Sequence, residues 1–322
     1  MNKKLISIIT PMFYEEENVS YYYKSMREMA DSLASEYNFE FIITDNSSTD
    51  ATFKILQNIT QEDRRFRIFR LSRNYGYQKS LWTGYCQSKG DASISIDCDL
   101  QDPPELFYKF IEEWKNGHQI VYGIRKSREE SFLKSRQITD IPYLRNFFYY
   151  LLNKISSNDM PKNAGDFMLI DKKITEILKE IEDHNIYIRG TIFSLGFNKK
   201  GIPYKRKARK FGKTKFKFSS SLKLALDGIV SMSGLPLKIA SVFGIIIALS
   251  TTILSGFFIV AKFFFDINMP AGLTTIIVLI LFGISLNALF LGIIGEYIAR
   301  IYDQRSNRPI TIIKESVDKS ED

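Results

Sequence analysis

A chain of 322 residues with 45% hydrophobic residues can form one large domain or two ordinary ones around a sizeable core. With two cysteines and two histidines, it offers no disulfide framework and argues against a Cys/His zinc site or a histidine-centred triad. The net charge of +8 is unevenly spread, because no acidic residue occurs between Asp183 and Asp227, a segment rich in lysine and arginine.

The first 125 residues alternate short β-branched or aromatic runs with segments of helical spacing. This alternation predicts an α/β fold with a mostly parallel sheet. The apolar run after Met1 is short and turns acidic at once, so no signal peptide is expected. Strands are predicted at Leu5–Thr10, Phe39–Thr44, Phe66–Leu71, Ala92–Asp97 and Gln119–Gly123, and helices at Val19–Tyr37, Asp50–Ile59, Gln78–Ser88 and from Pro103 onward.

Beyond residue 125 the pattern loosens. Tyr143–Ile155 fits either a core helix or a helix lying on a membrane interface, and Gly165–Asp171 resembles a further strand. Leu222–Lys238 is amphipathic and predicts an interfacial helix. The polar tail from Ser316 is expected to be disordered.

Two long apolar runs, Ile239–Ala261 and Ile267–Gly295, contain no charged residue. Each exceeds the roughly 20 apolar residues that a membrane-spanning helix needs. A pair of buried core helices is the alternative, but core helices of this length rarely lack every charge. Basic residues flank the pair on both outer sides, so the positive-inside rule places both chain termini in the cytoplasm.

Polar segments follow four of the predicted strands. They are Pro11–Asn18, Asp45–Asp50, Ser72–Gln78 and Asp97–Asp102. A solvated turn would explain any one of them. In parallel sheets, however, ligands bind at the carboxyl ends of the strands, so four such segments on one edge predict a site.

The last of these segments contains a D-x-D pair. In extended chain Asp97 and Asp99 would point the same way, with the amide of Gln101 on the same face. Oxygen ligands of this kind suit Mg²⁺ or Mn²⁺. Asp102 and Glu105 are interpreted as caps of the helix that follows.

Two nucleotide motifs are excluded. Phe211–Thr214 (FGKT) matches the end of a P-loop, but Lys207 stands where that loop needs glycine. The chain also lacks a G-x-G-x-x-G sequence, so dinucleotide redox chemistry has no support.

The motif SIDCDLQDPPE (Ser95–Glu105) resembles the signature of the polyprenyl-phosphate glycosyltransferases. This is the family 2 group with the GT-A fold that includes dolichol-phosphate mannose synthase and the bactoprenol glucosyltransferases. PMFYEEEN, DNSSTD, LSRNYGYQKSLWTGY, GDFMLID, RKFGKTKF and IGEYIARIYDQRSNRPI resemble further motifs of the group in the same order, over nearly the whole chain. The chain departs from the pattern at three places. Asn46-Ser47 stands where Asp-Gly is usual, Met168 stands where Arg is usual, and Thr214 stands where Ser is usual. These changes leave the choice of sugar open.

The resemblance implies inverting transfer of a hexose from a UDP-sugar, with UDP-glucose favoured, to undecaprenyl phosphate. The product would serve the modification of surface glycans, and Mg²⁺ or Mn²⁺ would be the cofactor. A GDP-mannose donor and a UDP-amino-sugar donor are the alternatives within this class. A non-catalytic membrane partner is the alternative from another class.

The resemblance also assigns site residues. The metal ligands would be Asp97, Asp99 and Gln101, and Asp166 would position the donor or the acceptor. Arg189 is a weaker phosphate candidate. For the basic residues the alternative is a patch on anionic lipid. The expected donor contacts are Pro11, Phe13, Glu15, Asp45 and Asp97, with Glu16 nearby, and the expected phosphate contacts are Arg206, Arg209, Lys213 and Lys215.

The predicted organisation has four parts: a GT-A domain at 1–217, a juxtamembrane amphipathic helix at 218–238, a transmembrane hairpin at 239–298 and a cytoplasmic tail at 299–322. The expected location is the bacterial inner membrane, with the catalytic domain in the cytoplasm. Nucleic acid is not an expected partner, because the basic block adjoins an apolar span. Assembly into homo-oligomers is left open.

Overall fold

The computed structural model describes residues 3–125, 161, 164–183, 186–207, 290–295 and 309–319, together with single or paired positions between 246 and 301. The chain divides into two compact units. Unit 1 combines Met1–Leu224 with Arg308–Asp322, and unit 2 is Ala225–Asn307. Unit 2 is therefore an insertion between two parts of the same unit.

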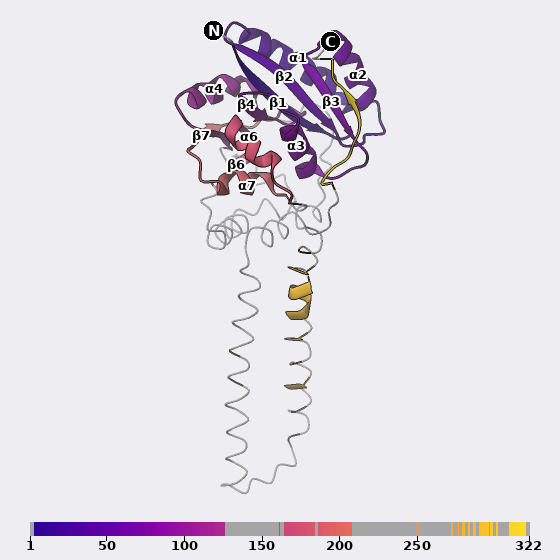
Figure 1. Ribbon diagram of the computed structural model, residues 1–322, viewed down its shortest axis with the longest axis vertical. Helices are drawn as coiled ribbons and strands as arrows, with labels where there is room; N and C mark the ends of the chain where they lie inside the picture. Colours follow the sequence, from indigo (N-terminus) through magenta and orange to yellow (C-terminus); the bar gives the residue numbers. More distant parts are fainter. Residues whose placement is uncertain are drawn as a thin grey trace, which may run out of the picture. The chain divides into compact units, whose positions relative to one another are not determined.

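Unit 1 is built on a sheet of eight described strands in the order β7-β5-β6-β4-β1-β2-β3-β8 (Figure 1). Strands β1, β2, β3, β4, β5 and β7 run in one direction, whereas β6 and β8 run in the other. The carboxyl ends of six strands thus meet at one edge, which confirms the α/β fold with a mostly parallel sheet. The strands are β1 (Lys4–Met12), β2 (Tyr37–Asp45), β3 (Phe66–Leu71), β4 (Ala92–Ser95), β5 (Ile120–Arg125), β6 (Ala164–Asp171), β7 (Lys199–Tyr204) and β8 (Ile313–Val317).

Helices cover both faces of this sheet (Figure 1). Helices α1, α2 and α4 pack on one face and contribute to its large hydrophobic cluster, whereas α3, α6 and α7 lie on the other. The described helices are α1 (Glu16–Ser32), α2 (Thr52–Glu62), α3 (Tyr77–Cys86), the short 3₁₀ turn η1 (Pro104–Leu106), α4 (Phe107–Lys115), α6 (Lys172–Lys179) and α7 (Ile188–Ser194).

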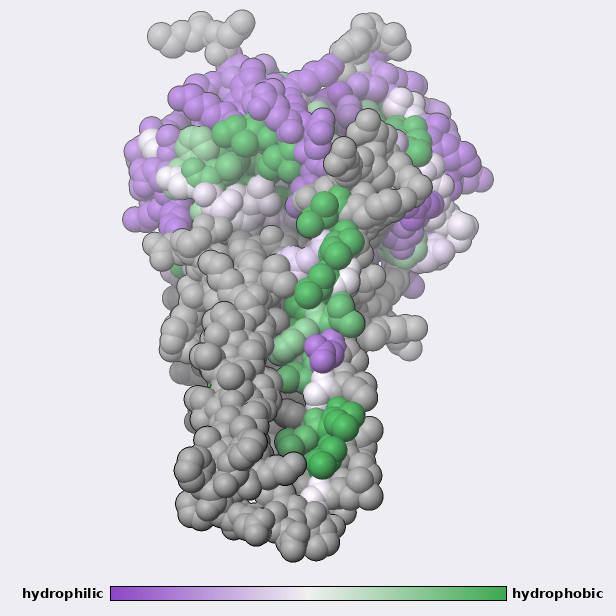
Figure 2. All heavy atoms as spheres, turned by 60° about the horizontal axis from the view of Figure 1, so that its bottom comes forward, coloured by the Kyte–Doolittle hydropathy of each residue, from purple (hydrophilic) through white to green (hydrophobic). Residues whose placement is uncertain are grey.

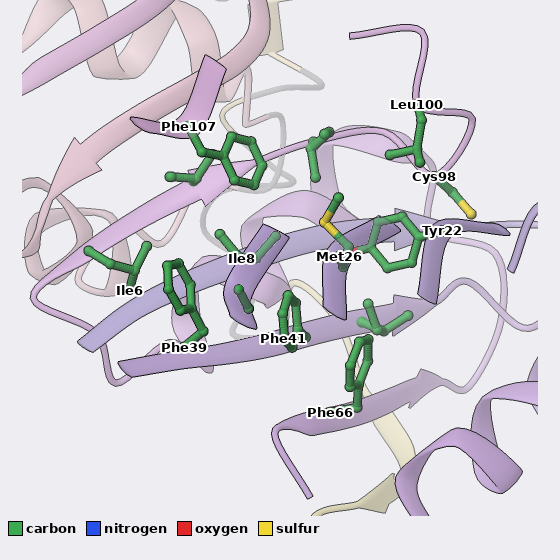
Figure 3. Packing of buried hydrophobic residues seen from close by; sticks show 14 of the residues in the cluster. Ile6, Ile8, Tyr22, Met26, Phe39, Phe41, Phe66, Cys98, Leu100 and Phe107 are labelled. Atoms are coloured by element: carbon green, nitrogen blue, oxygen red, sulfur yellow. The ribbon is translucent and has the colours of Figure 1, made fainter. Parts of the chain in front are cut away.

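The main core lies between α1 and the central strands. Figure 3 shows Tyr22 and Met26 of α1 lying over Ile8 and Phe41, all of them buried. The ring of Phe41 stacks on that of Phe66, with centroids 4.3 Å apart. Burying one such side chain stabilises the fold by roughly 1.5–3 kcal/mol, so this layer fixes the strands that carry the site.

On the opposite face, α3 approaches β1 closely at Gly84. A Cβ atom added there would lie 2.3 Å from Cγ2 of Ile9, a distance that no packed pair of carbons tolerates. Glycine therefore lets α3 lie against the sheet, and this places Tyr77 at the start of α3 beside the carboxyl ends of the strands.

The C-terminal segment forms the last strand of the sheet. β8 pairs antiparallel with β3, and Asp318 just beyond it forms an ion pair with Arg67. The expectation of disorder from Ser316 is therefore wrong as far as Asp318. Pairing with an edge strand orders a segment that its polar composition alone would leave free.

Unit 2 is described only at 290–295 and at single or paired helical positions, which are mostly hydrophobic (Figure 2). Several isoleucines and leucines at these positions, such as Ile280, Leu291 and Ile298, are exposed. Within the described part of the chain, no helix combines the length and the apolarity needed to cross a membrane. The predicted spans, and the helices predicted at 143–155 and 222–238, lie largely or wholly outside the described residues.

Candidate active site

All four predicted polar segments are joined at the carboxyl edge by hydrogen bonds, the fourth through the Tyr77 hydroxyl, which donates to Asp97. The backbone N–H of Tyr14, after β1, donates to Oγ of Ser48, after β2, at 3.1 Å. Asn46 then links β2 to the loop after β3, because its Nδ2 donates to Oδ1 of Asn74 at 2.9 Å and its Oδ1 accepts from the N–H of Tyr75. The edge is therefore one connected surface.

Residue 47 shows how the chain tolerates its departure from the family motif. Ser47 has φ 64°, a left-handed conformation that glycine adopts freely. Serine thus adopts here the backbone conformation that the usual glycine favours, at a cost of roughly 1–2 kcal/mol. Asn46 is buried and bonded as described above, so both departures have a structural role.

The predicted donor residues lie along this edge. Pro11 and Phe13 are half-buried, and the Phe13 ring packs against that of Tyr14. The carboxylate of Glu15 accepts from Nδ2 of Asn18 at 2.6 Å, and that of Glu16 accepts from the N–H of Ala51 at 2.9 Å. Direct contact of these residues with a nucleoside stays a prediction.

Asp45 lies deeper than a typical ligand contact. Its side chain is fully buried, accepts from the N–H of Ser48 at 3.1 Å and pairs with Nε of Arg70 at 3.4 Å. Burial raises the pKa of Asp45 above its ordinary value, although the Ser48 hydrogen bonds oppose this shift. In this structure Asp45 organises the loop after β2, and its contact with a donor stays a prediction.

The D-x-D segment is a turn. β4 ends at Ser95, and the N–H of Leu100, which has φ 48°, donates to the carbonyl of Asp97 at 3.2 Å. Oδ1 of Asp99 accepts from the N–H of Gln101. The interpretation that Asp97, Asp99 and Gln101 line one face of an extended strand is therefore wrong, because the chain leaves the sheet before Asp97.

Asp97 nevertheless stands at the centre of a group of polar side chains. Its Oδ1 accepts from the hydroxyl of Tyr77 at 2.8 Å, and its Oδ2 lies 4.0 Å from Nη2 of Arg206. Burial and then repulsion from the carboxylates of Asp102, Asp99 and Asp166 raise the pKa of Asp97 to about 6. The site thus carries more negative charge than its own cations offset.

Asp166 is the third residue of β6 and lies close enough to Asp97 to repel it. Its backbone carbonyl accepts from Oγ of Ser95, and its Oδ1 is buried with no hydrogen-bond partner among the described residues. A buried carboxylate oxygen without a partner is costly, which indicates a place for a ligand. The position of Asp166 is compatible with its predicted role in holding a substrate or metal.

Asp102 is not the helix cap that the sequence predicts. The 3₁₀ turn begins after Pro103 without any side-chain cap. The Asp102 side chain is instead buried and accepts from the Tyr204 hydroxyl, from Nε of Arg206 at 3.2 Å and from Nη2 of Arg125 at 3.3 Å. The charged donors stabilise the carboxylate in this buried position. There it links the end of β5 to the end of β7.

The basic candidates are only partly covered by the structure. Arg206 reaches Asp97 and Asp102, as expected of a site residue. Arg189 donates to the carbonyl of Ala164 at 2.6 Å and to the hydroxyl of Tyr187, which gives it a structural role. Arg209, Lys213 and Lys215 lie outside the described residues.

Two features of the carboxylates suit a divalent cation that also binds substrate phosphates. Asp97 lies close enough to other carboxylates, Asp166 among them, to be repelled by them, and Oδ1 of Asp166 is buried without a hydrogen-bond partner among the described residues. No group of three or more acidic, histidine or cysteine side chains in the described part of the chain is arranged to hold a metal. Mg²⁺ usually binds one or two carboxylates together with substrate phosphates, so the residues present fit such an ion.

Comparison with known proteins decides the family. The family model for glycosyl transferase family 2 matches residues 7–178, more than half of the chain. The chain belongs to glycosyltransferase family 2. This family 2 glycosyltransferase is 35% identical over 312 residues to the uncharacterized glycosyltransferase YkcC of Bacillus subtilis (strain 168), covering 96% of this chain and 93% of that protein. It is 32% identical over 311 residues to the SfII prophage-derived bactoprenol glucosyl transferase of Shigella flexneri, covering 97% and 98%.

Solved structures resemble this family 2 glycosyltransferase more weakly. Glucosyl-3-phosphoglycerate synthase from Mycobacterium tuberculosis, in complex with Mn²⁺, uridine-diphosphate and phosphoglyceric acid, is 14% identical with a TM-score of 0.47. The likeness covers 72% of this chain and 79% of that one. The assignment to the family therefore rests on sequence, and the roles of single residues rest on the geometry given above.

Proposed function

We propose that this glycosyltransferase moves a hexose from a nucleotide-diphosphate sugar to a polyprenyl phosphate, with inversion at the anomeric carbon. The observation that carries the proposal is the position of Asp97, held by Tyr77 and flanked by Arg206 at the carboxyl edge of the sheet. Relatives named bactoprenol glucosyl transferases align over nearly their whole length and support a lipid acceptor. Family membership favours an enzyme over a non-catalytic membrane partner.

The reaction needs little acid–base help from the protein. An oxygen of the lipid phosphate forms the new bond to the anomeric carbon, and the bond to the donor diphosphate breaks with its electron pair leaving on the nucleoside diphosphate. The acceptor is already ionised near neutral pH, so no proton has to be removed. The task left to residues such as Arg206 and Asp166 is to bind and orient the two phosphorylated substrates.

Asp97 and Asp99, with Gln101, are the residues that would hold Mg²⁺ or Mn²⁺. When bound, such an ion offsets the negative charge that grows on the leaving diphosphate. Tyr77 orients one oxygen of Asp97 and leaves the other facing Arg206 at 4.0 Å. Gln101 currently directs its amide N–H₂ toward the carbonyl of Lys207 at 3.4 Å, which leaves the amide oxygen as its only possible ligand atom.

UDP-glucose is the proposed donor, with GDP-mannose and UDP-amino sugars as alternatives. The proposed location is the inner membrane of a bacterium, with unit 1 on the cytoplasmic side and unit 2 as a two-helix hairpin. The charge-free runs at 239–261 and 267–295 and the exposed isoleucines and leucines of unit 2 support this location.

The test uses the purified full chain with undecaprenyl phosphate, Mn²⁺ or Mg²⁺ and a panel of labelled nucleotide sugars. We expect labelled lipid from UDP-glucose and its loss in Asp99→Asn. Glu105→Gln is the matched control, because this carboxylate is six residues further on and exposed, and it should keep normal transfer. If no donor gave labelled lipid, the proposed function would be wrong.

A further inference from the structure

One buried carboxylate joins three donors near the proposed site. The Asp102 side chain is 2% exposed. Its Oδ1 accepts from the Tyr204 hydroxyl and from Arg206, and its Oδ2 accepts from Arg125. The ring of bonds closes because Nε of Arg125 also donates to the Tyr204 oxygen at 3.2 Å. Two guanidinium groups therefore depend on one carboxylate.

Two glycines make room for this arrangement. A Cβ at Gly123 would lie 2.6 Å from the Tyr204 ring, and a Cβ at Gly165 would lie 3.0 Å from Nη2 of Arg125. The Tyr204 ring also packs edge-on against Phe167, with centroids 5.7 Å apart. The Tyr204 ring cannot move far without meeting neighbouring atoms, so Asp102 is held from this side by a fixed partner.

The segment after β7 is also bound to the D-x-D loop through the backbone. The N–H of Lys207 donates to the carbonyl of Gln101 at 2.8 Å. Arg206 lies between this backbone contact and the Asp102 bond. Its position relative to Asp97 is therefore determined by the loop that carries Asp97 itself.

Arg206 faces two carboxylates, and Asp102 holds it more closely. The distance from Nε to Oδ1 of Asp102 is 3.2 Å, whereas Nη2 is 4.0 Å from Oδ2 of Asp97. If Asp102 lost its charge, Asp97 would become the stronger partner for the guanidinium. An arginine paired with Asp97 would then compete with a divalent cation for the same oxygen.

We propose that Asp102 is a positioning residue that holds Arg125 and Arg206 at the edge of the site and keeps Arg206 off Asp97, so that Asp97 stays available to a divalent cation. The inference rests on the proposed function, because it takes Asp97 as a metal ligand. Asp102 itself touches neither substrate nor metal; it acts through the two arginines.

The test measures Mn²⁺ binding to the full chain without substrates, by the electron paramagnetic resonance signal of free Mn²⁺. Asp102→Asn keeps the shape of the side chain and removes its charge. We expect its dissociation constant for Mn²⁺ to rise by about tenfold or more. Glu105→Gln removes a charge from the same segment but from an exposed side chain, and should bind within about twofold of the wild type.

A second substitution separates the action through Arg206 from a simple loss of negative charge. In the Asp102→Asn background, Arg206→Gln removes the group that would pair with Asp97. We expect most of the lost Mn²⁺ affinity to return. If the double variant bound as weakly as Asp102→Asn alone, Asp102 would act only as a distant charge and the proposal would be wrong.

Tyr204→Phe keeps the test decisive if Asp102→Asn fails to fold. It retains the ring that packs on Phe167 and removes the hydroxyl between Arg125 and Asp102. We expect it to weaken Mn²⁺ binding by roughly threefold. Unchanged binding in both Asp102→Asn and Tyr204→Phe would overturn the inference alone, whereas a wild-type protein that bound no Mn²⁺ would overturn the proposed metal and the inference together.

Discussion

Nε of Arg67 donates to Oδ2 of Asp318 at 2.7 Å, which joins the third strand of the sheet to the last described part of the chain. The other side of the guanidinium donates to Glu40 of β2 at 2.6 Å, and both Arg67 and Glu40 are buried. The C-terminal segment thus supplies one of the two carboxylates that pair with the buried Arg67.

We expect Asp318→Ala to lower the free energy of unfolding of unit 1 by about 1–2 kcal/mol, because a partly buried hydrogen bond to a charged group is lost while Glu40 remains. Urea unfolding followed by tryptophan fluorescence measures this, since Trp82 and Trp114, the two tryptophans of the chain, both lie in unit 1. Asp318→Asn keeps an acceptor and should lose less. An Asp318→Ala midpoint equal to that of the wild type would show that the pair contributes nothing.

Tyr77→Phe removes the hydroxyl that holds one oxygen of Asp97. We expect kcat to fall about tenfold with little change in KM for the donor, because the carboxylate loses its orientation while the substrate contacts remain. Steady-state transfer assays measure both constants. Tyr108→Phe, an exposed tyrosine of α4, is the control and should leave them unchanged; an equal effect of the two substitutions would contradict the role given to Tyr77.

The raised pKa of Asp97, about 6, predicts a pH dependence of the metal-free protein. Its folded pKa lies above the value of 3.8 expected for an unfolded chain, so the contribution of Asp97 to stability is full below pH 4 and is lost as the pH rises through about 6. The stability of the wild type relative to Asp97→Asn should therefore decrease between about pH 4 and pH 6.5 and then level off. Urea unfolding of both proteins with a chelator present checks this.

Added Mn²⁺ should restore the stability that the wild type loses, relative to Asp97→Asn, as the pH rises. At pH 7.5 a bound cation offsets the repulsion around Asp97, so added Mn²⁺ should stabilise the wild type more than Asp97→Asn. Equal stabilisation of the two proteins, or a difference between them that does not vary with pH, would argue against the electrostatic account of the site.

Gly84→Ala should destabilise unit 1 by about 2 kcal/mol, because the new methyl group would lie against Ile9 and push α3 from the sheet. The same substitution made in an Ile9→Ala background should cost clearly less, since the clashing Cγ2 atom is gone. Thermal unfolding of the four proteins of this cycle measures the difference. Additive effects would show that α3 does not depend on this contact.

Much of the fold follows from local pattern. β1, β2 and β3 start or end near their predicted bounds, because each is rich in the β-branched and aromatic side chains that buried strands favour. β7 and β8 were not predicted. β7 reads KKGIPY and β8 reads IKESV with exposed side chains, so neither shows a strand pattern, and both are ordered by pairing with a neighbouring strand.

The sequence predicts which loops form the site, but it does not predict the hydrogen bonds within the site. Asp97 and Asp99 follow a strand end as expected, yet the turn at Leu100 depends on a left-handed backbone that leucine rarely adopts. The partners of Asp102 are Arg125, Tyr204 and Arg206, which lie 23 to 104 residues away along the chain. These residues meet because β7 pairs with β5, and no local sequence motif predicts that pairing.

The position of β8 sets an order of events during synthesis. β3 lies next to the edge of the sheet, and its outer side is covered by the edge strand β8, which comes last along the chain among the described strands. Until the chain has been made as far as Val317, the nascent catalytic unit therefore presents the run FRIFRL (Phe66–Leu71) as an open edge that other chains could extend. A fragment ending at residue 224 would keep that edge permanently, so its tendency to aggregate would reflect a missing strand.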